Sequence, residues 1–281
     1  MELALGAPPK LRELPIFQNT PELEMQLRHK KKVVKARAIL DTGAADIYIP
    51  KDIVEKLGIK LDDLDRGTRF YGVKGGKTSY PFVFDELSIP AAPGCRLSPV
   101  YARTSRIDPV GAILLGRPFI RSAGMKIMFE KFKNTFRLIC ARRGITARET
   151  RRPLQFDDPK SMFRRFTLKV GENSMTGPCY VDTGATVTLL PLWLARDLGV
   201  RTQIIPQRAG GAAGSFTVLI GELDEMALEG TSCVHSGPIR ALISPHAGFP
   251  IVGVDFFRAT GMTLDFASDI PKITCSLKGK P

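Results

Sequence analysis

The stretch LDTGA at residues 40–44 occurs a second time, as VDTGA at residues 181–185. In each copy an apolar residue leads into an Asp, and a Thr, a Gly and an Ala follow it. Because Gly permits a sharp turn of the backbone, this order of residues places a carboxylate on a tight loop with backbone N–H groups nearby. One such short match is weak evidence, since it can arise by chance. Two copies with matching flanks indicate that the chain carries two related halves.

The spacing of other residues supports an internal duplication. The interval from the Asp to a following Pro is nine residues in both halves. A later group, Gly-x-x-Phe-x-Arg-x-x-Gly-Met, begins at Gly116 and again at Gly253. Packing or turn formation explains each of these residues alone. Together they predict a duplicated fold in which a pseudo-twofold axis brings the two Asp loops together.

Alternating apolar residues and turn signals predict an all-β fold with few helices. We expect hairpins over residues 22–40, 69–84 and 125–140, and short helices over residues 51–57 and after the strand at residues 113–115. By the overlay, the second half follows the same plan, so each half ends with one short helix near its C-terminal end. The sequence thus predicts tandem β-barrel domains.

Composition shifts predict the domain boundaries. Residues 1–21 contain four prolines and show no periodicity, so we expect an extended N-terminal arm there. Residues 141–161 are charged and aperiodic, which is typical of a linker; a solvated connector is favoured over a self-cleavage site. The two halves are then expected at residues 22–140 and 162–281.

The chain is long enough for two domains, with 281 residues of which 43% are hydrophobic. No apolar run approaches the roughly 20 residues that span a bilayer. The first ten residues carry an acidic residue where a signal peptide would be basic. These features predict no contact with a membrane and a cytoplasmic location.

Cysteine and histidine usage argues against several kinds of site. The five cysteines are widely scattered, without a Cys-x-x-Cys pair or a His at ligand spacing, so we expect reduced, mostly structural thiols, no disulfide framework and no zinc site. Only three histidines are present, which argues against a His-based catalytic apparatus. We expect neither a cofactor nor a metal.

The net charge of +13 lies almost entirely in the first half, where residues 1–150 hold 27 basic and 16 acidic side chains. Such an excess is typical of a solvated surface, an acidic partner or nucleic acid. The basic residues near the N-terminus are not interleaved with aromatic residues, which favours a solvated surface.

Two facing Asp side chains supply a complete hydrolytic chemistry. Carboxyls held within about 3 Å cannot both ionise at neutral pH, so they share a proton. One then acts as general base on a water while the other, protonated, polarises the carbonyl under attack. Thr42 and Thr183 can lock the loops together through their hydroxyls, and Gly43 and Gly184 let backbone amides approach the carboxylates.

These residues carry a resemblance to a known family. Each half resembles a retropepsin-like aspartic protease domain, the family of the retroviral proteases. The first half does so through its Asp-Thr-Gly-Ala loop, the Gly-rich hairpin at residues 72–76 and the apolar strand before Gly116, and the second through its Asp-Thr-Gly-Ala loop and Ile251-Val252-Gly253. The resemblance covers most of residues 22–140 and 163–278. It implies an aspartic endopeptidase that hydrolyses an extended peptide beneath two flaps, with an acidic-shifted optimum, sensitivity to statine-type inhibitors and, because the halves are fused, function as a monomer.

The resemblance assigns site residues to positions in this sequence. Asp41 and Asp182 are expected to be catalytic, supported by Thr42, Gly43, Ala44, Thr183, Gly184 and Ala185. The residues expected in the flaps or against the substrate are Tyr71, Gly72, Val73, Lys74, Gly75, Gly76, Gly210, Gly211, Ala212, Ala213 and Gly214. Tyr71 is expected either to cover the substrate or only to pack within its hairpin.

The two halves depart from each other in ways that predict an asymmetric cleft. Arg117 follows Gly116 as in the retroviral pattern, whereas Val254 follows Gly253, so an ion pair typical of the family is missing from one half. Asp46 is matched by Val187. We therefore expect a preference for a non-palindromic peptide sequence.

Two other classes of function compete with an active protease. The same fold could serve as a catalytically silent peptide-binding or scaffold module, because fold and function separate readily. A third possibility is a nucleic-acid-associated protein that binds through the basic first half, with a strong dependence on salt.

Overall fold

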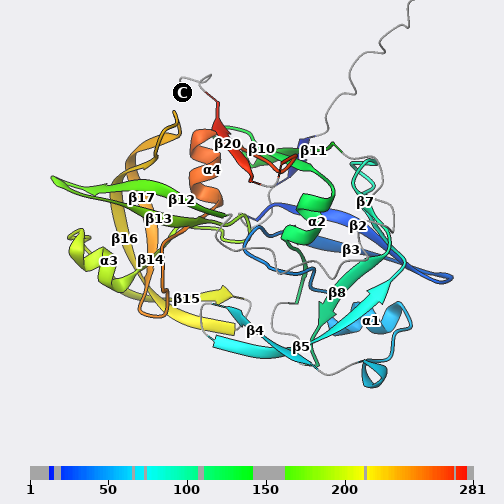
Figure 1. Cartoon of the computed structure of the whole chain (residues 1–281). Coiled ribbons are helices and arrows are strands. Elements are labelled where there is room, and N and C mark those ends of the chain that lie inside the picture. Colours follow the sequence, from blue (N-terminus) through cyan, green and yellow to red (C-terminus); the bar gives the residue numbers. More distant parts are fainter. Residues whose placement is uncertain are drawn as a thin grey trace, which may run out of the picture.

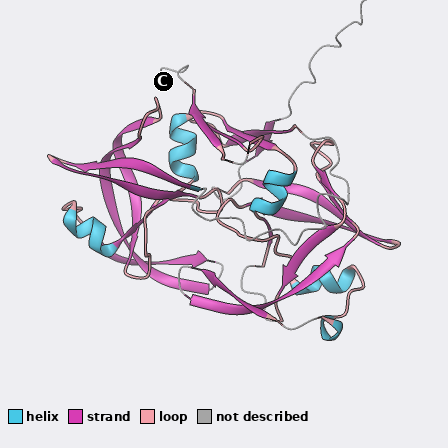
Figure 2. Cartoon of the chain, in the orientation of Figure 1, coloured by secondary structure: helices cyan, strands magenta, loops and turns pink. Residues whose placement is uncertain are grey.

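The structure of the chain, a computed structural model, describes residues 13–15, 20–64, 67–72, 75–106, 111–141, 162–211, 214–268 and 270–276. Strands make up most of the described chain and four short helices accompany them (Figure 2). This agrees with the predicted all-β class. No helix in the described ranges is long and apolar enough to cross a bilayer.

The first half follows the predicted order of elements. Its strands are β2 (Glu22–His29), β3 (Lys32–Leu40), β4 (Thr68–Gly72), β5 (Gly75–Phe84), β6 (Glu86–Ser88), β7 (Arg96–Leu97), β8 (Val100–Thr104), β9 (Ile113–Leu115), β10 (Met125–Phe129) and β11 (Thr135–Cys140). Its helices are α1 (Lys51–Lys56), the 3-10 helix η1 (Leu61–Asp63) and α2 (Arg117–Ser122). The three expected hairpins and both expected helices are therefore confirmed.

The second half repeats this plan with fewer interruptions. Its strands are β12 (Phe163–Val170), β13 (Asn173–Val181), β14 (Leu189–Pro191), β15 (Gln203–Gly211), β16 (Gly214–Leu228), β17 (Val234–Ser244), β18 (Ile251–Val252), β19 (Met262–Asp265) and β20 (Lys272–Cys275). Its helices are α3 (Leu192–Asp197) and α4 (Val254–Thr260). Helices α2 and α4 are the expected ones near the end of each half.

Sheet pairing confirms the duplication at the level of individual residues. In the second half, seven strands in the order β12-β13-β18-β14-β17-β16-β15 close on themselves through an additional β12–β16 pairing. In the first half the equivalent strands form two separate sheets, in the orders β7-β6-β2-β3-β9 and β4-β5-β8. Tyr48 bridges to Arg103 and Leu114 between these sheets. Leu189 of β14 makes the matching pairs, with Leu242 and Ile251.

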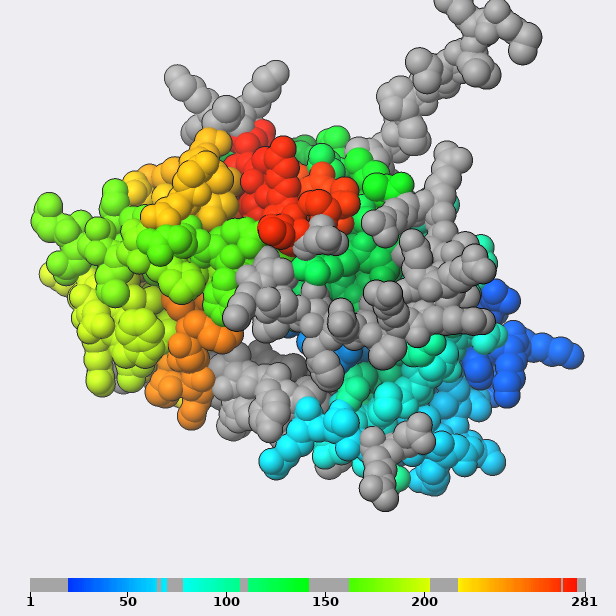
Figure 3. All heavy atoms as spheres, in the orientation of Figure 1, coloured from blue at the N-terminus to red at the C-terminus, as the bar shows by residue number. Residues whose placement is uncertain are grey.

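A third sheet, in the order β1-β11-β10-β19-β20, joins the halves. At its centre β10 pairs antiparallel with β19, and Ile127 lies opposite Leu264. Both side chains are fully buried, so the joint continues the hydrophobic core. Figures 1 and 3 show β19 and β20 (red) against the green segment that contains β10 and β11. Antiparallel pairing of equivalent strands is the arrangement that a pseudo-twofold axis requires.

The arm expected at residues 1–21 contains a paired element that the sequence did not suggest. Strand β1 (Glu13–Pro15) adds to the edge of the joining sheet, where it pairs antiparallel with β11. An edge position tolerates Pro15, because a proline cannot donate a hydrogen bond to a neighbouring strand. Residues 142–161, most of the expected linker, lie outside the described residues, so the domain boundaries stay predictions.

The expectation of reduced cysteines without disulfides is wrong. Cys95 is bonded to Cys140 and Cys233 to Cys275, with Cα–Cα distances of 5.3 and 5.2 Å. Among the cysteines only the buried Cys179 is free. The spacing of the cysteines did not indicate the two disulfides, because the partners are 45 and 42 residues apart in the sequence. They come together because the last hairpin of each half returns the chain to an earlier loop.

The two disulfides occupy equivalent places. Cys140 lies opposite Met125 and Cys275 opposite Met262, and these methionines end the repeated group that follows Gly116 and Gly253. Each bond therefore ties the second strand of the last hairpin, β11 or β20, to a loop of its own half.

Candidate active site

Two equivalent strand ends place the Asp residues. Strands β3 and β13 each lie parallel to a short apolar strand, β9 or β18. The pairing continues one residue further, since Asp41 N–H donates to Leu115 O at 3.1 Å and Asp182 N–H to Val252 O at 3.0 Å. Each Asp is thus fixed at the point where its strand gives way to the loop.

The two loops are locked together by reciprocal hydrogen bonds of their threonines. The hydroxyl of Thr42 donates to Val181 O at 3.0 Å and accepts from Thr183 N–H at 3.0 Å. The hydroxyl of Thr183 donates to Leu40 O at 2.6 Å and accepts from Thr42 N–H at 3.0 Å. Both side chains are fully buried, so the predicted locking role of the threonines agrees with the geometry.

Each loop glycine lies directly against the Asp of the other half. A Cβ atom at Gly43 would come within 2.5 Å of an Asp182 carboxylate oxygen, and one at Gly184 within 2.6 Å of Asp41. No larger residue allows this approach. The N–H of Gly43 donates to Asp182 Oδ1 at 3.1 Å, and the N–H of Gly184 donates to the same oxygen at 2.8 Å.

The alanines close the loops on their own halves. Ala44 N–H donates to Asp41 Oδ1 at 2.9 Å, and Ala185 N–H donates to Asp182 O at 3.3 Å. The carbonyl oxygens of Ala44 and Ala185 accept from the first N–H groups of α2 and α4, at 3.0 and 2.9 Å. Each loop is therefore also attached to the helix that follows its apolar strand.

The carboxyls of Asp41 and Asp182 form a coupled pair. The two side chains hydrogen-bond to each other, and burial raises the pKa of both. The pKa of Asp41 is raised well above its ordinary value, first by burial and then by the charge of Asp182. Around Asp182 the amides of Gly184 and Gly43 and the charge of Arg117 oppose the rise. Both residues keep some exposure, so solvent reaches the pair.

Arg117 is the large charged side chain that supports the first loop. It is 1% exposed, and its Nη1 donates to Thr42 O at 2.9 Å and to Gly43 O at 3.2 Å. The same nitrogen donates to the hydroxyl of Tyr180 on the other half. The sequence singled out Arg117 but missed Tyr180, although this residue directly precedes VDTGA where the first half has Ile39.

The second half supports its loop with an acidic residue instead. Val254 stands where the first half has Arg117, and the next residue, Asp255, accepts from Thr188 N–H at 3.1 and 3.0 Å and from its hydroxyl at 3.1 Å. Burial raises the pKa of Asp255. Sequence reasoning missed this pair, for which the replacement of Pro118 by an Asp in the overlay was the available signal.

The expected flap residues lie partly on two equivalent hairpins. Tyr71, Gly72, Gly75 and Gly76 end β4 and begin β5, with Gly72 opposite Gly75. In the second half Gly210 and Gly211 end β15, Gly214 begins β16, and Gly211 lies opposite Gly214. The tips Val73, Lys74, Ala212 and Ala213 lie outside the described residues. Figure 1 draws both hairpins along the lower edge, on the side away from β10 and β20.

A charged pair marks the first half beside the loop. Asp46 lies 3.5 Å from Arg103, measured from Oδ2 to Nε, and burial raises the pKa of Asp46 against the charges of Arg103 and Arg117. Val187 replaces Asp46 in the second half. The side chains beside the two Asp loops therefore differ between the halves, as the sequence predicted.

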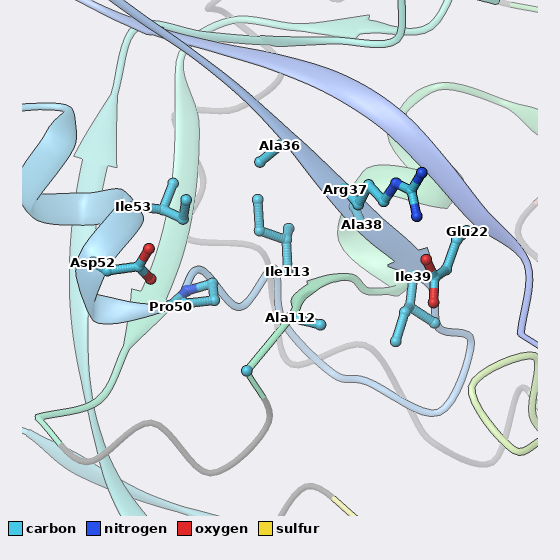
Figure 4. Close-up of a pocket in the computed structure, with 11 residues that line it drawn as sticks. Glu22, Ala36, Arg37, Ala38, Ile39, Pro50, Asp52, Ile53, Ala112 and Ile113 are labelled. Atoms are coloured by element: carbon cyan, nitrogen blue, oxygen red, sulfur yellow. The ribbon is translucent and has the colours of Figure 1, made fainter. Parts of the chain in front are cut away.

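A separate hollow of about 330 Å³ lies on the first half (Figure 4). Its walls come from β2, β3, the start of α1 and the segment before β9. Glu22, Arg37 and Asp52 are its charged residues, and the rest of the lining is apolar apart from the backbone. Neither Asp41 nor Asp182 lines it, so it does not belong to the Asp pair.

Two Asp-Thr-Gly loops, contributed by equivalent halves of one β-rich chain and joined by a shared sheet, define a duplicated aspartic protease fold. The sequence matches the family described as aspartyl protease over residues 26–119 and again over residues 167–256. The chain therefore belongs to this family and carries its retropepsin-like domain twice.

A search of solved structures found a retropepsin-like aspartic protease from Rickettsia conorii, 19% identical, with a TM-score of 0.35. The match covers 46% of this chain and 89% of that protein. A search of curated protein sequences found no match.

Proposed function

We propose that the protein is an aspartic endopeptidase in which Asp41 and Asp182 activate a water molecule to hydrolyse a peptide bond. The observation that supports this most strongly is the hydrogen bond between the two carboxyls, which come from loops 141 residues apart and are locked by Thr42 and Thr183. A purely structural pair of buried acids would be costly, since burial penalises a charged carboxylate. Buried, coupled acids of this kind are typical of catalytic sites.

The proposed reaction uses the single proton that the pair shares. One carboxylate removes a proton from a water held between the two side chains, and the other carboxyl donates its proton to the carbonyl oxygen of the substrate. The resulting diol collapses when the leaving amine takes up a proton from the pair. In each of these steps the protein group that gives or takes a proton is Asp41 or Asp182. The reaction therefore requires no further side chain.

The substrate proposed for this site is an extended peptide. We propose that hairpins β4/β5 and β15/β16 act as flaps, with Tyr71, Gly72, Gly75 and Gly76 in the first and Gly210, Gly211 and Gly214 in the second. An extended peptide adds to exposed strand edges through its backbone, while pockets read alternate side chains. Asp46 and Arg103 flank the site in the first half and Val187 in the second, so we propose that residues on the two sides of the cleaved bond are read differently.

The test compares cleavage of an unfolded protein by wild type, Asp41→Asn and Asp182→Asn. Each substitution should lower kcat/KM on the order of 10⁴-fold, the upper range for general acid–base catalysis. Asp62→Asn is the matched control, because Asp62 lies on η1 with a side chain 94% exposed, and it should cleave like wild type. Residual cleavage at the wild-type rate in either dyad variant would contradict the proposal.

The same variants separate the proposal from its alternatives. Wild type that binds peptides from a proteome-derived library but cleaves none would favour a silent peptide-binding module. We also propose that the chain acts as a monomer, because both loops come from one chain. Sedimentation that finds an obligate dimer would contradict this.

The cytoplasmic location stays a prediction, and the disulfides argue against it. Such bonds persist mainly in oxidising compartments. The two bonds Cys95–Cys140 and Cys233–Cys275 occupy equivalent places, so the pairing is a property of both halves. Alkylation of thiols in intact cells, followed by mass spectrometry, would report whether these cysteines are bonded there.

A further inference from the structure

One peptide group connects Arg117 to the carboxylate of the opposite half. The carbonyl oxygen of Thr42 accepts from Arg117 Nη1 at 2.9 Å. The N–H of the same peptide group belongs to Gly43 and donates to Asp182 Oδ1 at 3.1 Å. A cation bound to the carbonyl polarises the peptide and strengthens the N–H as a donor. Arg117 therefore acts on Asp182 through a hydrogen-bonded chain as well as through space.

Among the residues of the second half that the structure describes, no equivalent chain leads to Asp41. Val254 replaces Arg117, and the N–H of Gly184 donates to Asp182 of its own loop at 2.8 Å rather than crossing to Asp41. Tyr180, which also contacts Thr42 O at 3.4 Å, is matched by Ile39 in the first half. Both carboxyls accept backbone N–H groups, but it is the pKa of Asp182 that the positive charge of Arg117 lowers.

The charged groups around the pair follow the same asymmetry. On the first half, Arg117 begins α2, and Asp46 is paired with Arg103 of β8. On the second half, Asp255 of α4 is engaged by Thr188. Arg117 is the cation that donates to the carbonyl oxygens of Thr42 and Gly43 and whose charge acts on Asp182.

We propose that Arg117 makes the pair asymmetric, so that in the free protein Asp182 is the ionised carboxylate and Asp41 carries the shared proton. Asp182 Oδ1 accepts the N–H groups of Gly43 and Gly184 at 3.1 and 2.8 Å, and the positive charge of Arg117 acts on this carboxyl. Asp41 accepts from Ala44 N–H at 2.9 Å and from Gly43 N–H, but the charge that acts on it is the negative charge of Asp182. Arg117 is in this view a positioning residue, since it acts through the Thr42–Gly43 peptide and not on the substrate.

This assignment rests on the proposed function and fixes the roles within it. Asp182 takes a proton from water as the oxygen–carbon bond forms, and Asp41 gives its proton to the carbonyl oxygen. When the carbon–nitrogen bond breaks, the proton on Asp182 passes to the amine and one hydroxyl of the diol returns its proton to Asp41. The pair is then in its starting state, with no change in oxidation.

The assignment can be tested without turnover. The full chain is labelled with ¹³C at the Asp carboxyls, and the remaining site Asp is titrated by NMR in Asp41→Asn and in Asp182→Asn. Asp41, left alone, should titrate at a clearly higher pH than Asp182, left alone. Equal values, or the reverse order, would overturn the proposal. A protein that proved catalytically silent could still show the expected order, so the two proposals fail separately.

A second series tests the part played by Arg117. In the Asp41→Asn background, Arg117→Met should move the titration of Asp182 to higher pH, and Arg117→Lys should restore most of the difference. Arg103→Met is the matched control, because it removes a cation of the same half that contacts Asp46, and it should leave the titration of Asp182 in place. If Arg117→Met left that titration unchanged, the role of Arg117 would be overturned. Should Arg117→Met not fold, Arg117→Lys tests the role of Arg117: it should raise the titration of Asp182 slightly, since Lys lacks the planar donor group, and a titration that is lowered would overturn the proposal.

Discussion

The two halves hold nearly identical loops by opposite means. Arg117, a cation, donates to the carbonyl oxygens of the first loop. Asp255, an acid, accepts from the N–H and hydroxyl of Thr188 just beyond the second. The Thr and Gly residues that touch across the halves are the same in both copies. The loop Thr and Gly residues contact the opposite loop, so a change in either half disturbs both. A supporting residue such as Arg117 or Asp255 can differ between the halves as long as the backbone groups beside it keep hydrogen-bond partners.

The disulfides should show equal behaviour of the halves. Cys95→Ser/Cys140→Ser and Cys233→Ser/Cys275→Ser should each lower the free energy of unfolding by about 4 kcal/mol, because the closed loops span 45 and 42 residues and loop entropy varies slowly with length. Urea denaturation measures both losses. Cys179→Ala, which removes a thiol but no bond, is the control and should cost clearly less. Markedly unequal losses in the two pairs would break the equivalence.

The supports should show the difference between the halves. Arg117→Met removes the hydrogen bonds from Arg117 to two loop carbonyls and to the Tyr180 hydroxyl and should cost about 3 kcal/mol. Asp255→Ala removes the acceptor of the Thr188 N–H and hydroxyl and should cost about 2 kcal/mol. Urea denaturation reports both values. Only Arg117→Met should also move the acid limb of the kcat/KM profile. A matching shift for Asp255→Ala would show that the two supports act alike on the pair.

The threonine lock should again be symmetric. Thr42→Val and Thr183→Val each remove one donated and one accepted hydrogen bond and should cost about 2 kcal/mol, at roughly 1 kcal/mol per bond. Thr42→Ser and Thr183→Ser keep the hydroxyl and serve as controls with a smaller loss. Thermal unfolding of the four variants measures the effect. A Val variant as stable as its Ser counterpart would contradict the lock.

The dependence of stability on pH should be the smallest effect. The folded pKa of Asp41 is raised, so its contribution to stability is fully present below the pKa of an unfolded Asp and is lost as the pH rises through the folded value. The stability advantage of wild type over Asp41→Asn should therefore shrink as the pH rises. Urea denaturation across that range measures it. An advantage that grows with pH would mean that Asp41 is not the proton carrier.

The sequence predicted the fold and the Asp pair because the information is local and repeated. An apolar strand, an Asp-Thr-Gly loop and a Gly-x-x-Phe group recur at matched spacing, and each fixes its own backbone. The disulfides were missed because they join residues far apart in sequence. An overlay of the two halves that includes the cysteines would have indicated them, because each half contains two cysteines at a similar separation.

The supporting residues were missed for a related reason. Whether Tyr180 and Asp255 contact a loop depends on how helices and strands pack, and a single sequence does not fix those contacts. Strand β1 pairs with β11, which lies far later in the sequence, so no local pattern indicates this pairing.

The pairing of β10 with β19 within one chain has a consequence for how such a site can change. In an assembly of two identical chains, every substitution appears on both sides of the cleft. Here the joined strands keep both sides on one chain at a high effective concentration, so a substitution alters one side only. Each half can then change independently of the other, without any cost to assembly at low protein concentration.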